Sequence, residues 1–304
     1  MSLLIVGSVA LDEVETPFGK TGRILGGAGT YISLAARHLV KEIHLISVVG
    51  GDFPQKYLDY FRHRQIDLTG LKIEEDEKTF FWAGRYHDDM NTRDTLVTEL
   101  NVLAGFNPVV PPNALHADFL MLGNLTPAIQ KGVIQQMKTR PKLIAMDTMN
   151  FWMHTAWDDL LEVISMIDVL TINDEEARML SGEYFIKKAA QKILAMGPKY
   201  LIVKKGEHGA LLFDKDNAFY APAMLLDQVV DPTGAGDTFA GGLMGYLASQ
   251  GEVSFHHIKN AMVYGSVLAS FTVEGFGTDN LLKITQKDIQ KRLDEFVAVA
   301  SFRL

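Results

Sequence analysis

Short apolar runs alternate with amphipathic stretches along most of this chain. The runs have the length of buried strands and cover Leu3–Gly7, Ile43–Val49, Asp118–Leu122, Leu143–Asp147, Val169–Asn173, Tyr200–Lys204 and Ala210–Phe213. Between them, helical spacing predicts helices over Thr30–Leu39, Pro54–Arg64, Ala128–Met137, Glu175–Leu180, Ile186–Met196, Thr238–Ser249, His256–Thr272 and Gln286–Ala298. This alternation predicts an α/β fold, with a mostly parallel sheet between two layers of helices.

Two segments depart from this rhythm. Residues Glu13–Leu25 and Lys78–Leu103 read as extended strands with no helix among them, and Asp88–Asn91 reads as a turn within the second segment. They suit a small antiparallel sheet. Since no linker, repeat or low-complexity tract interrupts the chain, residues 1–304 are predicted to form one domain with this sheet inserted.

Composition narrows the class of protein. The 304 residues carry a formal net charge of −8 and include no cysteine. The acidic balance argues against a nucleic-acid partner, and without cysteine there is neither a disulfide nor a thiolate metal site. Because no apolar run approaches the length of a membrane helix and Met1–Gly7 suits a buried strand, we expect a cytoplasmic protein with no membrane partner.

The most informative segment is 231–242, Asp-Pro-Thr-Gly-Ala-Gly-Asp-Thr-Phe-Ala-Gly-Gly. A helix is predicted to start inside it, and Gly234, Ala235 and Gly236 leave the first-turn N–H groups open to a ligand. These unpaired N–H groups and the helix dipole form a phosphate site. Asp237 lies in the same turn, where a carboxylate can take a proton from a hydroxyl that attacks the phosphate.

This segment closely resembles the C-terminal signature of the ribokinase-like (PfkB) carbohydrate kinase family. The resemblance implies a ribokinase-like three-layer sandwich with a small β-sheet lid, formed by about 13–25 and 78–103, over the acceptor. It also implies ATP as the phosphate donor, Mg²⁺ as cofactor, Asp237 as catalytic base and Gly234, Ala235 and Gly236 as the anion hole.

On the acceptor side, Asp12 follows the first predicted strand, where open α/β sheets bind ligands, although an ordinary turn aspartate would look the same. Gly26, Gly27 and Thr30 precede a helix and resemble the family's diglycine motif, which approaches the sugar. The family usually has an asparagine where this chain has Thr30, and that departure leaves the acceptor's identity open.

Two further segments resemble parts of the family's nucleotide site. Lys204, Gly206 and Gly209 lie in a turn after a predicted strand and would bind the nucleotide, although a plain hairpin turn with solvated charges has the same pattern. Asn150 belongs to a segment that resembles the family's Asp-x-Asn motif near the phosphates.

Two pairs resemble cation sites. Asn173 and Glu176 match the family's Asn-x-x-Glu motif, which organises magnesium through water, although acidic residues suit any helix start. Asp231 and Thr233 match positions that line a potassium site in several members, and helix capping explains them equally well.

In the lid, Trp82, Arg85, Tyr86 and Arg93 could touch the acceptor, but alternating aromatics also suit sheet packing or a contact between two copies of the chain. A homodimer through the lid is therefore a further expectation. The sequence as a whole predicts ATP-dependent phosphorylation of a hydroxymethyl group on a sugar or nucleoside. The alternative is a catalytically inactive sugar- or nucleotide-binding regulator on the same fold.

Overall fold

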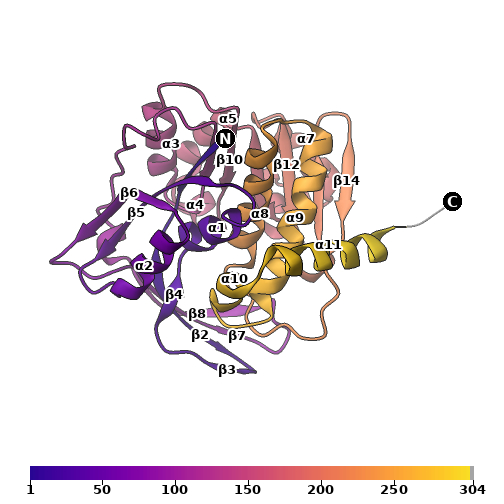
Figure 1. Ribbon diagram of the computed structural model, residues 1–304. Helices are drawn as coiled ribbons and strands as arrows, with labels where there is room; N and C mark the ends of the chain where they lie inside the picture. Colours follow the sequence, from indigo (N-terminus) through magenta and orange to yellow (C-terminus); the bar gives the residue numbers. More distant parts are fainter. Residues whose placement is uncertain (302–304) are drawn as a thin grey trace.

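A nine-stranded sheet between two helical layers forms the body of the molecule in the computed structural model, which describes residues 1–301 (Figure 1). Its order is β14-β13-β12-β11-β10-β9-β1-β5-β6. The strands are β1 (Ser2–Val6), β5 (Glu42–Gly50), β6 (Asp67–Glu74), β9 (Phe119–Leu122), β10 (Leu143–Asp147), β11 (Val169–Asn173), β12 (Tyr200–Lys204), β13 (Ala210–Phe213) and β14 (Ala218–Ala221). All neighbours pair in parallel except β12–β13 and β13–β14, so the predicted α/β architecture is confirmed.

Strand β1 explains why the sheet needs helices on both faces. Leu3 and Ile5 belong to one hydrophobic core, whereas Leu4 and Val6 belong to the other, and all four side chains are fully buried. Successive side chains of a strand point to opposite faces. A strand that is apolar at every position is therefore stable only when both faces are covered.

The helices divide between these two cores. One layer is formed by α1 (Ala28–Ala36), α2 (Gln55–His63), α8 (Ala235–Gln250), α9 (Phe255–Val273), α10 (Asp279–Lys283) and α11 (Gln286–Ala300). The other is formed by α3 (Pro127–Gln136), α4 (Asn150–Thr155), α5 (Trp157–Met166), α6 (Asp174–Ser181) and α7 (Ile186–Leu194). Within residues 1–301, no helix is both long and apolar enough to cross a membrane.

Helix α8 lies between α1 and α9. A Cβ atom on Gly241 would stand 2.4 Å from the carbonyl oxygen of Ile32 in α1, and one on Gly242 would stand 2.8 Å from the Cα of Gly265 in α9. The two glycines therefore let three helix backbones approach closely. This packing sets the position of the N-terminus of α8.

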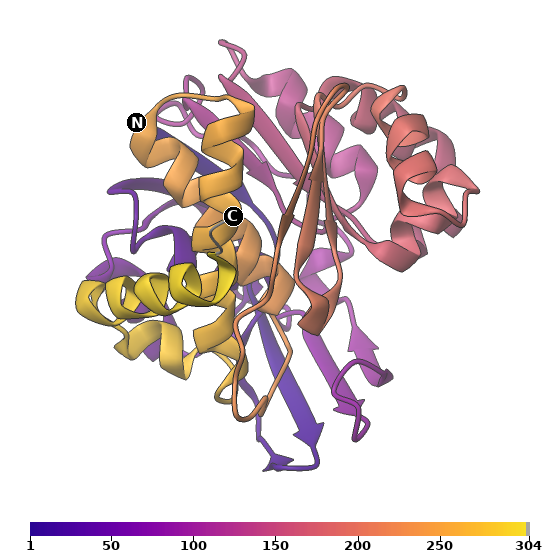
Figure 2. The ribbon, with the colours of Figure 1, turned by 90° about the vertical axis from the view of Figure 1, so that its right-hand side faces the viewer.

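A second, smaller sheet lies beneath the large one (Figures 1 and 2). It consists of β2 (Ala10–Thr16), β3 (Gly19–Lys20), β4 (Ile24–Gly26), β7 (Phe81–Tyr86) and β8 (Arg93–Glu99). The expectation of a purely antiparallel sheet is wrong, because β2 and β7 pair in parallel. A parallel pair needs a long crossover, which the intervening α1, β5, α2 and β6 supply.

Several elements escaped the sequence prediction. Strand β6 is an edge strand with half-exposed side chains, so it lacks an apolar run, and β14 is a short, largely exposed edge strand. Helices α4, α5 and α10 were also missed, although Leu160, Val163 and Ile164 of α5 carry a helical spacing. Helices α1 and α8 begin two and three residues earlier than Thr30 and Thr238, at Ala28 and Ala235.

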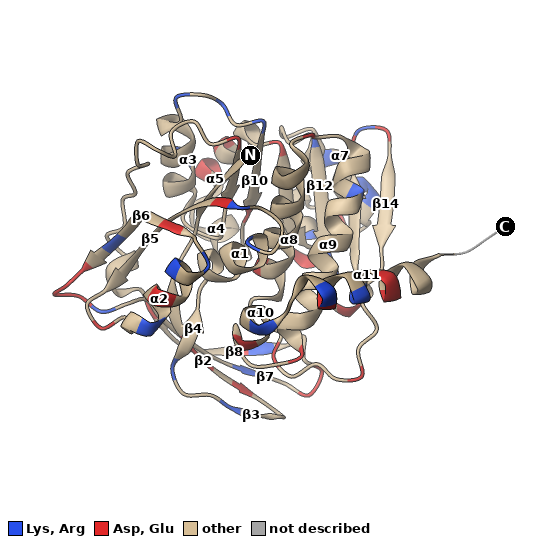
Figure 3. Ribbon diagram, in the orientation of Figure 1, with Lys and Arg blue, Asp and Glu red and all other residues tan. Residues whose placement is uncertain are grey.

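Charged residues are spread over the surface elements. Figure 3 shows acidic and basic segments interspersed along the visible helices and loops, and the central strands are mostly uncharged. The charged groups discussed below are exceptions, because they gather at the carboxyl ends of the parallel strands.

Candidate active site

The N-terminus of α8 forms the centre of the site. Its N-cap is Gly234, whose φ of 75° is a left-handed conformation that favours glycine, and a Cβ there would stand 2.4 Å from the ring of Tyr31. No side chain among residues 1–301 caps this helix, so the alternative that Asp231 or Thr233 caps it is wrong. The N–H of Ala235 donates to the carbonyl of Pro232, and within residues 1–301 the N–H groups of Gly236 and Asp237 have no backbone acceptor. These two N–H groups are available to an anion.

A lysine stands next to this turn. A Cβ on Gly236 would lie 3.2 Å from the Nζ of Lys204, which ends β12. Lys204 donates to the carboxylate of Asp147 at 2.7 Å, and Asp147 ends the nearby β10. Burial lowers the pKa of Lys204, but the charges of Asp147 and Glu176 outweigh it and hold this pKa above its ordinary value. Asp147 ends a predicted strand but was not among the predicted site residues.

Two carboxyl groups near this lysine have pKa values raised well above those of ordinary carboxylic acids. Burial raises the pKa of Asp237 to about 7; the charge of Asp147 adds to the shift, whereas Lys204 and Arg93 oppose it. Burial likewise raises the pKa of Glu176 to about 7, and Lys204 again opposes it. A carboxylate with a pKa near neutrality is well matched to general base catalysis.

Asn173 and Glu176 serve the fold as well as the site. The side chain of Asn173 accepts from the N–H of Glu176, and Glu176 accepts from the N–H of Asn173, both at 2.8 Å, so the two residues form the capping box of α6. No group of three His, Cys, Asp or Glu side chains in the described part of the chain could hold a metal ion. Within residues 1–301 the second carboxylate oxygen of Glu176 has no hydrogen-bond partner, which fits a magnesium ion held through water and nucleotide phosphates.

Asp231 is completely buried behind the start of α8. Its carboxylate accepts from the N–H groups of Thr233 at 2.9 Å and Gly277 at 3.0 Å. Burial raises its pKa, and these hydrogen bonds oppose the shift. In residues 1–301 no basic side chain forms an ion pair with Asp231, so the environment of this carboxylate suits a cation.

Asp12, predicted to bind the acceptor, lies within β2, so the alternative of an ordinary turn aspartate is wrong. Its carboxylate covers Gly26, where a Cβ would stand 1.9 Å from its Oδ2, so only glycine leaves room for it. Burial raises the pKa of Asp12 to about 7; the backbone of Gly27 opposes the shift, and the charges of Asp231 and Asp237 add to it. Thr30 is fully buried and its hydroxyl has no partner within residues 1–301.

Two tyrosines in this region escaped the predicted site. Tyr31 packs against Gly234, and its buried hydroxyl has no partner among residues 1–301. Burial, followed by the charges of Asp12, Asp231 and Asp237, holds its pKa well above the ordinary value. The hydroxyl of Tyr86 in the small sheet accepts from Thr233 at 3.3 Å. No pattern in the sequence distinguishes these tyrosines from core aromatics.

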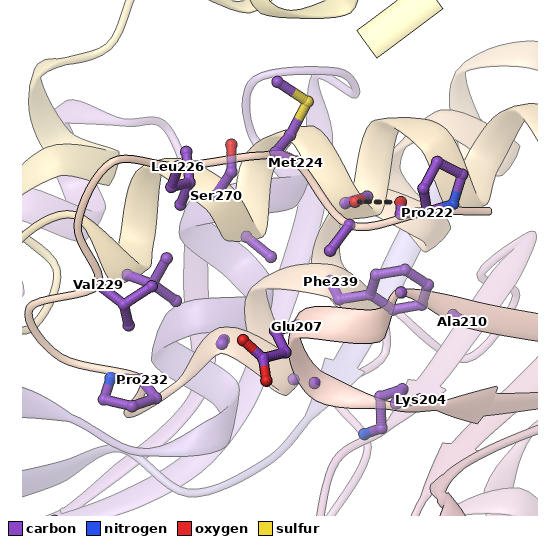
Figure 4. Close-up of a pocket in the computed structure, with 18 of the residues that line it drawn as sticks. Lys204, Glu207, Ala210, Pro222, Met224, Leu226, Val229, Pro232, Phe239 and Ser270 are labelled. Carbon is purple, nitrogen blue, oxygen red and sulfur yellow. Dashed lines mark hydrogen bonds between the residues drawn. The ribbon is translucent and has the colours of Figure 1, made fainter. Parts of the chain in front are cut away.

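A cavity of about 360 Å³ opens beside Lys204 and the start of α8 (Figure 4). Lys204, Gly206 and Gly209, the residues that the sequence predicted to bind the nucleotide, line it together with Ala235 and Gly236. Its remaining walls are mainly apolar and include Met224, Leu226, Val229, Phe239 and Ser270. An apolar cavity that ends at a lysine and open N–H groups suits a nucleotide, with its base among the apolar walls and its phosphates at α8.

The small sheet also reaches this cavity. Asp89, Met90 and Asn91 of the β7–β8 turn line it, and the Oδ1 of Asn91 would stand 3.0 Å from a Cβ on Gly206. Asn150, in contrast, is exposed at the start of α4 and does not line the cavity. The sequence predicted the turn between β7 and β8 but not its contact with Gly206, because a contact between residues more than a hundred positions apart leaves no local pattern.

These features define an α/β protein in which open N–H groups at a helix N-terminus lie between a cavity of about 360 Å³ and buried carboxylates. The model of the pfkB family of carbohydrate kinases matches residues 6–285. A cytidine kinase of Thermococcus kodakarensis is 27% identical over 249 residues, covering 81% of this chain and 88% of that relative. A nucleoside kinase of Methanocaldococcus jannaschii is 24% identical over 283 residues, covering 92% of this chain and 88% of the relative.

Solved structures agree with the fold. The crystal structure of the Methanocaldococcus jannaschii nucleoside kinase has a TM-score of 0.78 and 22% identity, covering 97% of this chain and 99% of that one. Burkholderia thailandensis nucleoside kinase in complex with inosine has a TM-score of 0.76 and 19% identity, covering 100% of both chains. The chain belongs to the pfkB family of carbohydrate kinases, and its fold is ribokinase-like.

Proposed function

We propose that this kinase transfers the γ-phosphoryl group of ATP to a hydroxymethyl group of a nucleoside or a related sugar. The observation that carries the proposal is the convergence of Asp237, the open N–H groups of α8 and Lys204 between a nucleotide-sized cavity and Asp12. A nucleoside is the preferred acceptor class, because the cytidine and nucleoside kinases described above match most of this chain.

Each part of the site has a role in the reaction. Asp237 takes the proton of the acceptor hydroxyl as its oxygen attacks the γ-phosphorus. The open N–H groups of Gly236 and Asp237, in the anion hole formed with Gly234 and Ala235, and the ammonium of Lys204 stabilise the charge on the transferred phosphoryl group. Asp12, Gly26, Gly27 and Thr30 hold the acceptor, while the small sheet acts as a lid that excludes water.

Cations complete the proposed site. A magnesium ion, held by nucleotide phosphates and water near Asn173 and Glu176, would neutralise negative charge on the phosphates.

Gly206 and Gly209 would line the nucleotide, and Asn150 remains a more peripheral candidate for contact with it.

An ATP-consumption screen tests the proposal directly. The purified protein is offered ATP, Mg²⁺ and a panel of nucleosides, pentoses, hexoses and sugar phosphates. We expect ADP to form stoichiometrically with a phosphorylated nucleoside. ATP binding without turnover on any acceptor would instead favour the catalytically inactive regulator.

Replacing Asp12 with alanine is expected to lower the specificity constant for the acceptor by about ten- to more than a hundredfold. A hydrogen bond to a charged group contributes roughly 1.5–3 kcal/mol. Steady-state kinetics with varied acceptor measures the loss, and the affinity for a non-hydrolysable ATP analogue should not change. Glu13→Ala is the matched control, because Glu13 pairs with Lys20 at 2.8 Å on the small sheet. Equal losses for acceptor and nucleotide would point to a folding defect.

Potassium is expected to accelerate the reaction through Asp231 and Thr233. The buried carboxylate of Asp231 accepts hydrogen bonds from Thr233 and Gly277 but forms no ion pair with a basic side chain within residues 1–301, and a nearby cation would orient the start of α8. Initial rates are measured at constant ionic strength with potassium, sodium or a bulky organic cation as the only monovalent species. Identical rates in all three would leave Asp231 with a structural role alone.

A homodimer through the lid belongs to the same proposal. Strand β8 forms an edge of the small sheet and exposes Leu96 and Val97, so a second copy could pair along it. Sedimentation velocity at micromolar concentration distinguishes this dimer from a monomer.

A further inference from the structure

Arg93 begins β8, and the small sheet holds it above the acceptor side of the site. It lies opposite Tyr86 in the β7–β8 pairing, and its guanidinium carbon stands 5.4 Å from the centre of the Trp82 ring. Trp82 pairs in turn with Asp12 across β2 and β7. The strand register therefore places the guanidinium beside the strand that carries Asp12.

The same corner of the sheet contacts the start of α8. Thr233, one residue before Gly234, donates its hydroxyl to Tyr86, the cross-strand neighbour of Arg93. Arg93, as the cross-strand neighbour of Tyr86, therefore begins β8 next to the part of the small sheet that contacts the start of α8. Burial raises the pKa of Asp12 and of Asp237, and in both cases the positive charge of Arg93 acts in the opposite direction.

No carboxylate in the described part of the chain forms an ion pair with Arg93. Arg85, on the neighbouring strand, differs in this respect, because its Nε stands 2.8 Å from a carboxylate oxygen of Glu15. Arg85 is thus engaged within the small sheet, whereas Arg93 keeps five N–H donors for a ligand. A planar fork of donors beside a phosphate site fits a phosphoryl group.

We propose that Arg93 is a catalytic residue that binds the phosphoryl group during transfer, on the side of the anion hole opposite Lys204. The inference rests on the proposed kinase function. In the step, the acceptor hydroxyl gives its proton to Asp237 while its oxygen forms a bond to the γ-phosphorus. The bond from that phosphorus to the β–γ bridging oxygen breaks, and ADP leaves with the electron pair. Arg93 transfers no proton; it stabilises negative charge that moves from the nucleotide towards the acceptor.

The test compares Arg93→Gln with Arg85→Gln, a matched control on the same sheet. We expect Arg93→Gln to lower kcat by about 10²–10³-fold, as removal of one donor to a developing charge does. The affinity for a non-hydrolysable ATP analogue should not change, and Arg85→Gln should keep wild-type kcat. In Arg93→Ala, added guanidinium ions should restore part of kcat, whereas sodium at equal ionic strength should not.

Three results would be decisive against Arg93. A kcat of Arg93→Gln within threefold of wild type would overturn the inference. A higher KM for the acceptor at unchanged kcat would make Arg93 an acceptor-binding residue instead. Absence of guanidinium rescue, together with a lower melting temperature, would assign it a structural role. A failure of the kinase proposal itself would look different from these three results. In that case the wild-type enzyme would phosphorylate no acceptor of the panel.

Discussion

Asp237→Asn is expected to lower the turnover number by about 10²–10⁴-fold, the usual contribution of a general base. Asparagine preserves the shape of the side chain but cannot accept the proton of the acceptor hydroxyl. Nucleotide affinity should change little, because the N–H groups of α8 and Lys204 remain. Single-turnover kinetics with saturating ATP and acceptor measures the effect. An Asn variant with full turnover would show that the assigned mechanism is wrong.

The raised pKa of Asp237 also predicts how the activity and stability of the wild-type enzyme depend on pH. Since the base acts when unprotonated, wild-type kcat/KM should rise through about pH 7 and then level off. The same raised pKa means that the folded state binds this proton more tightly than the unfolded chain. Ionisation therefore costs stability as pH rises from about 4 to 7.

Asn removes that cost, so the free energy of unfolding of Asp237→Asn should exceed that of wild type at pH 8. The expected gain is on the order of 1–4 kcal/mol, because one pKa unit corresponds to about 1.4 kcal/mol. It should shrink as pH falls towards 4. Urea titrations at pH 8 and pH 5 measure it, and a gain that is independent of pH would contradict the assigned pKa shift.

Lys204→Met should damage both stability and turnover. It leaves the buried carboxylate of Asp147 without its partner at 2.7 Å, which is expected to cost about 3–5 kcal/mol of unfolding free energy. It also removes a cation beside the transferred phosphoryl group, so we expect a further loss of about 10²–10³-fold in turnover. Urea titration and initial rates measure the two effects. Lys205→Met is the matched control, since neighbouring Lys205 forms no ion pair within residues 1–301.

The two effects of Lys204→Met separate in a double variant. Asp147→Asn combined with Lys204→Met removes both charges and should recover most of the lost stability. Turnover should stay low, because the phosphoryl group still lacks its cation. A double variant that regains activity would show that Lys204 serves only to neutralise Asp147.

Local signals predicted the large sheet because its strands are buried on both faces. Except for Ser2 at the start of β1, every position of β1 and β10 is apolar or, like Asp147, ends at the site, so the apolar run itself marks the strand. Edge strands β6 and β14 lack this signal, since half of their side chains contact water. The small sheet was located from alternation, but alternation does not report partners, and the parallel β2–β7 pair was therefore missed.

The sequence by itself determined the helix start at which we propose the phosphate site and the position of its proposed base. Gly234, Ala235, Gly236 and Asp237 are consecutive, and one helix start places their N–H groups and the carboxylate together. Only the tertiary structure decided what surrounds this turn. Lys204 contacts Asp147 on another strand, because parallel strands bring their carboxyl ends to one edge of the sheet. The β7–β8 turn, which belongs to the small sheet, lines the same cavity as Gly206. Such contacts depend on packing over long separations, which no local pattern of residues encodes.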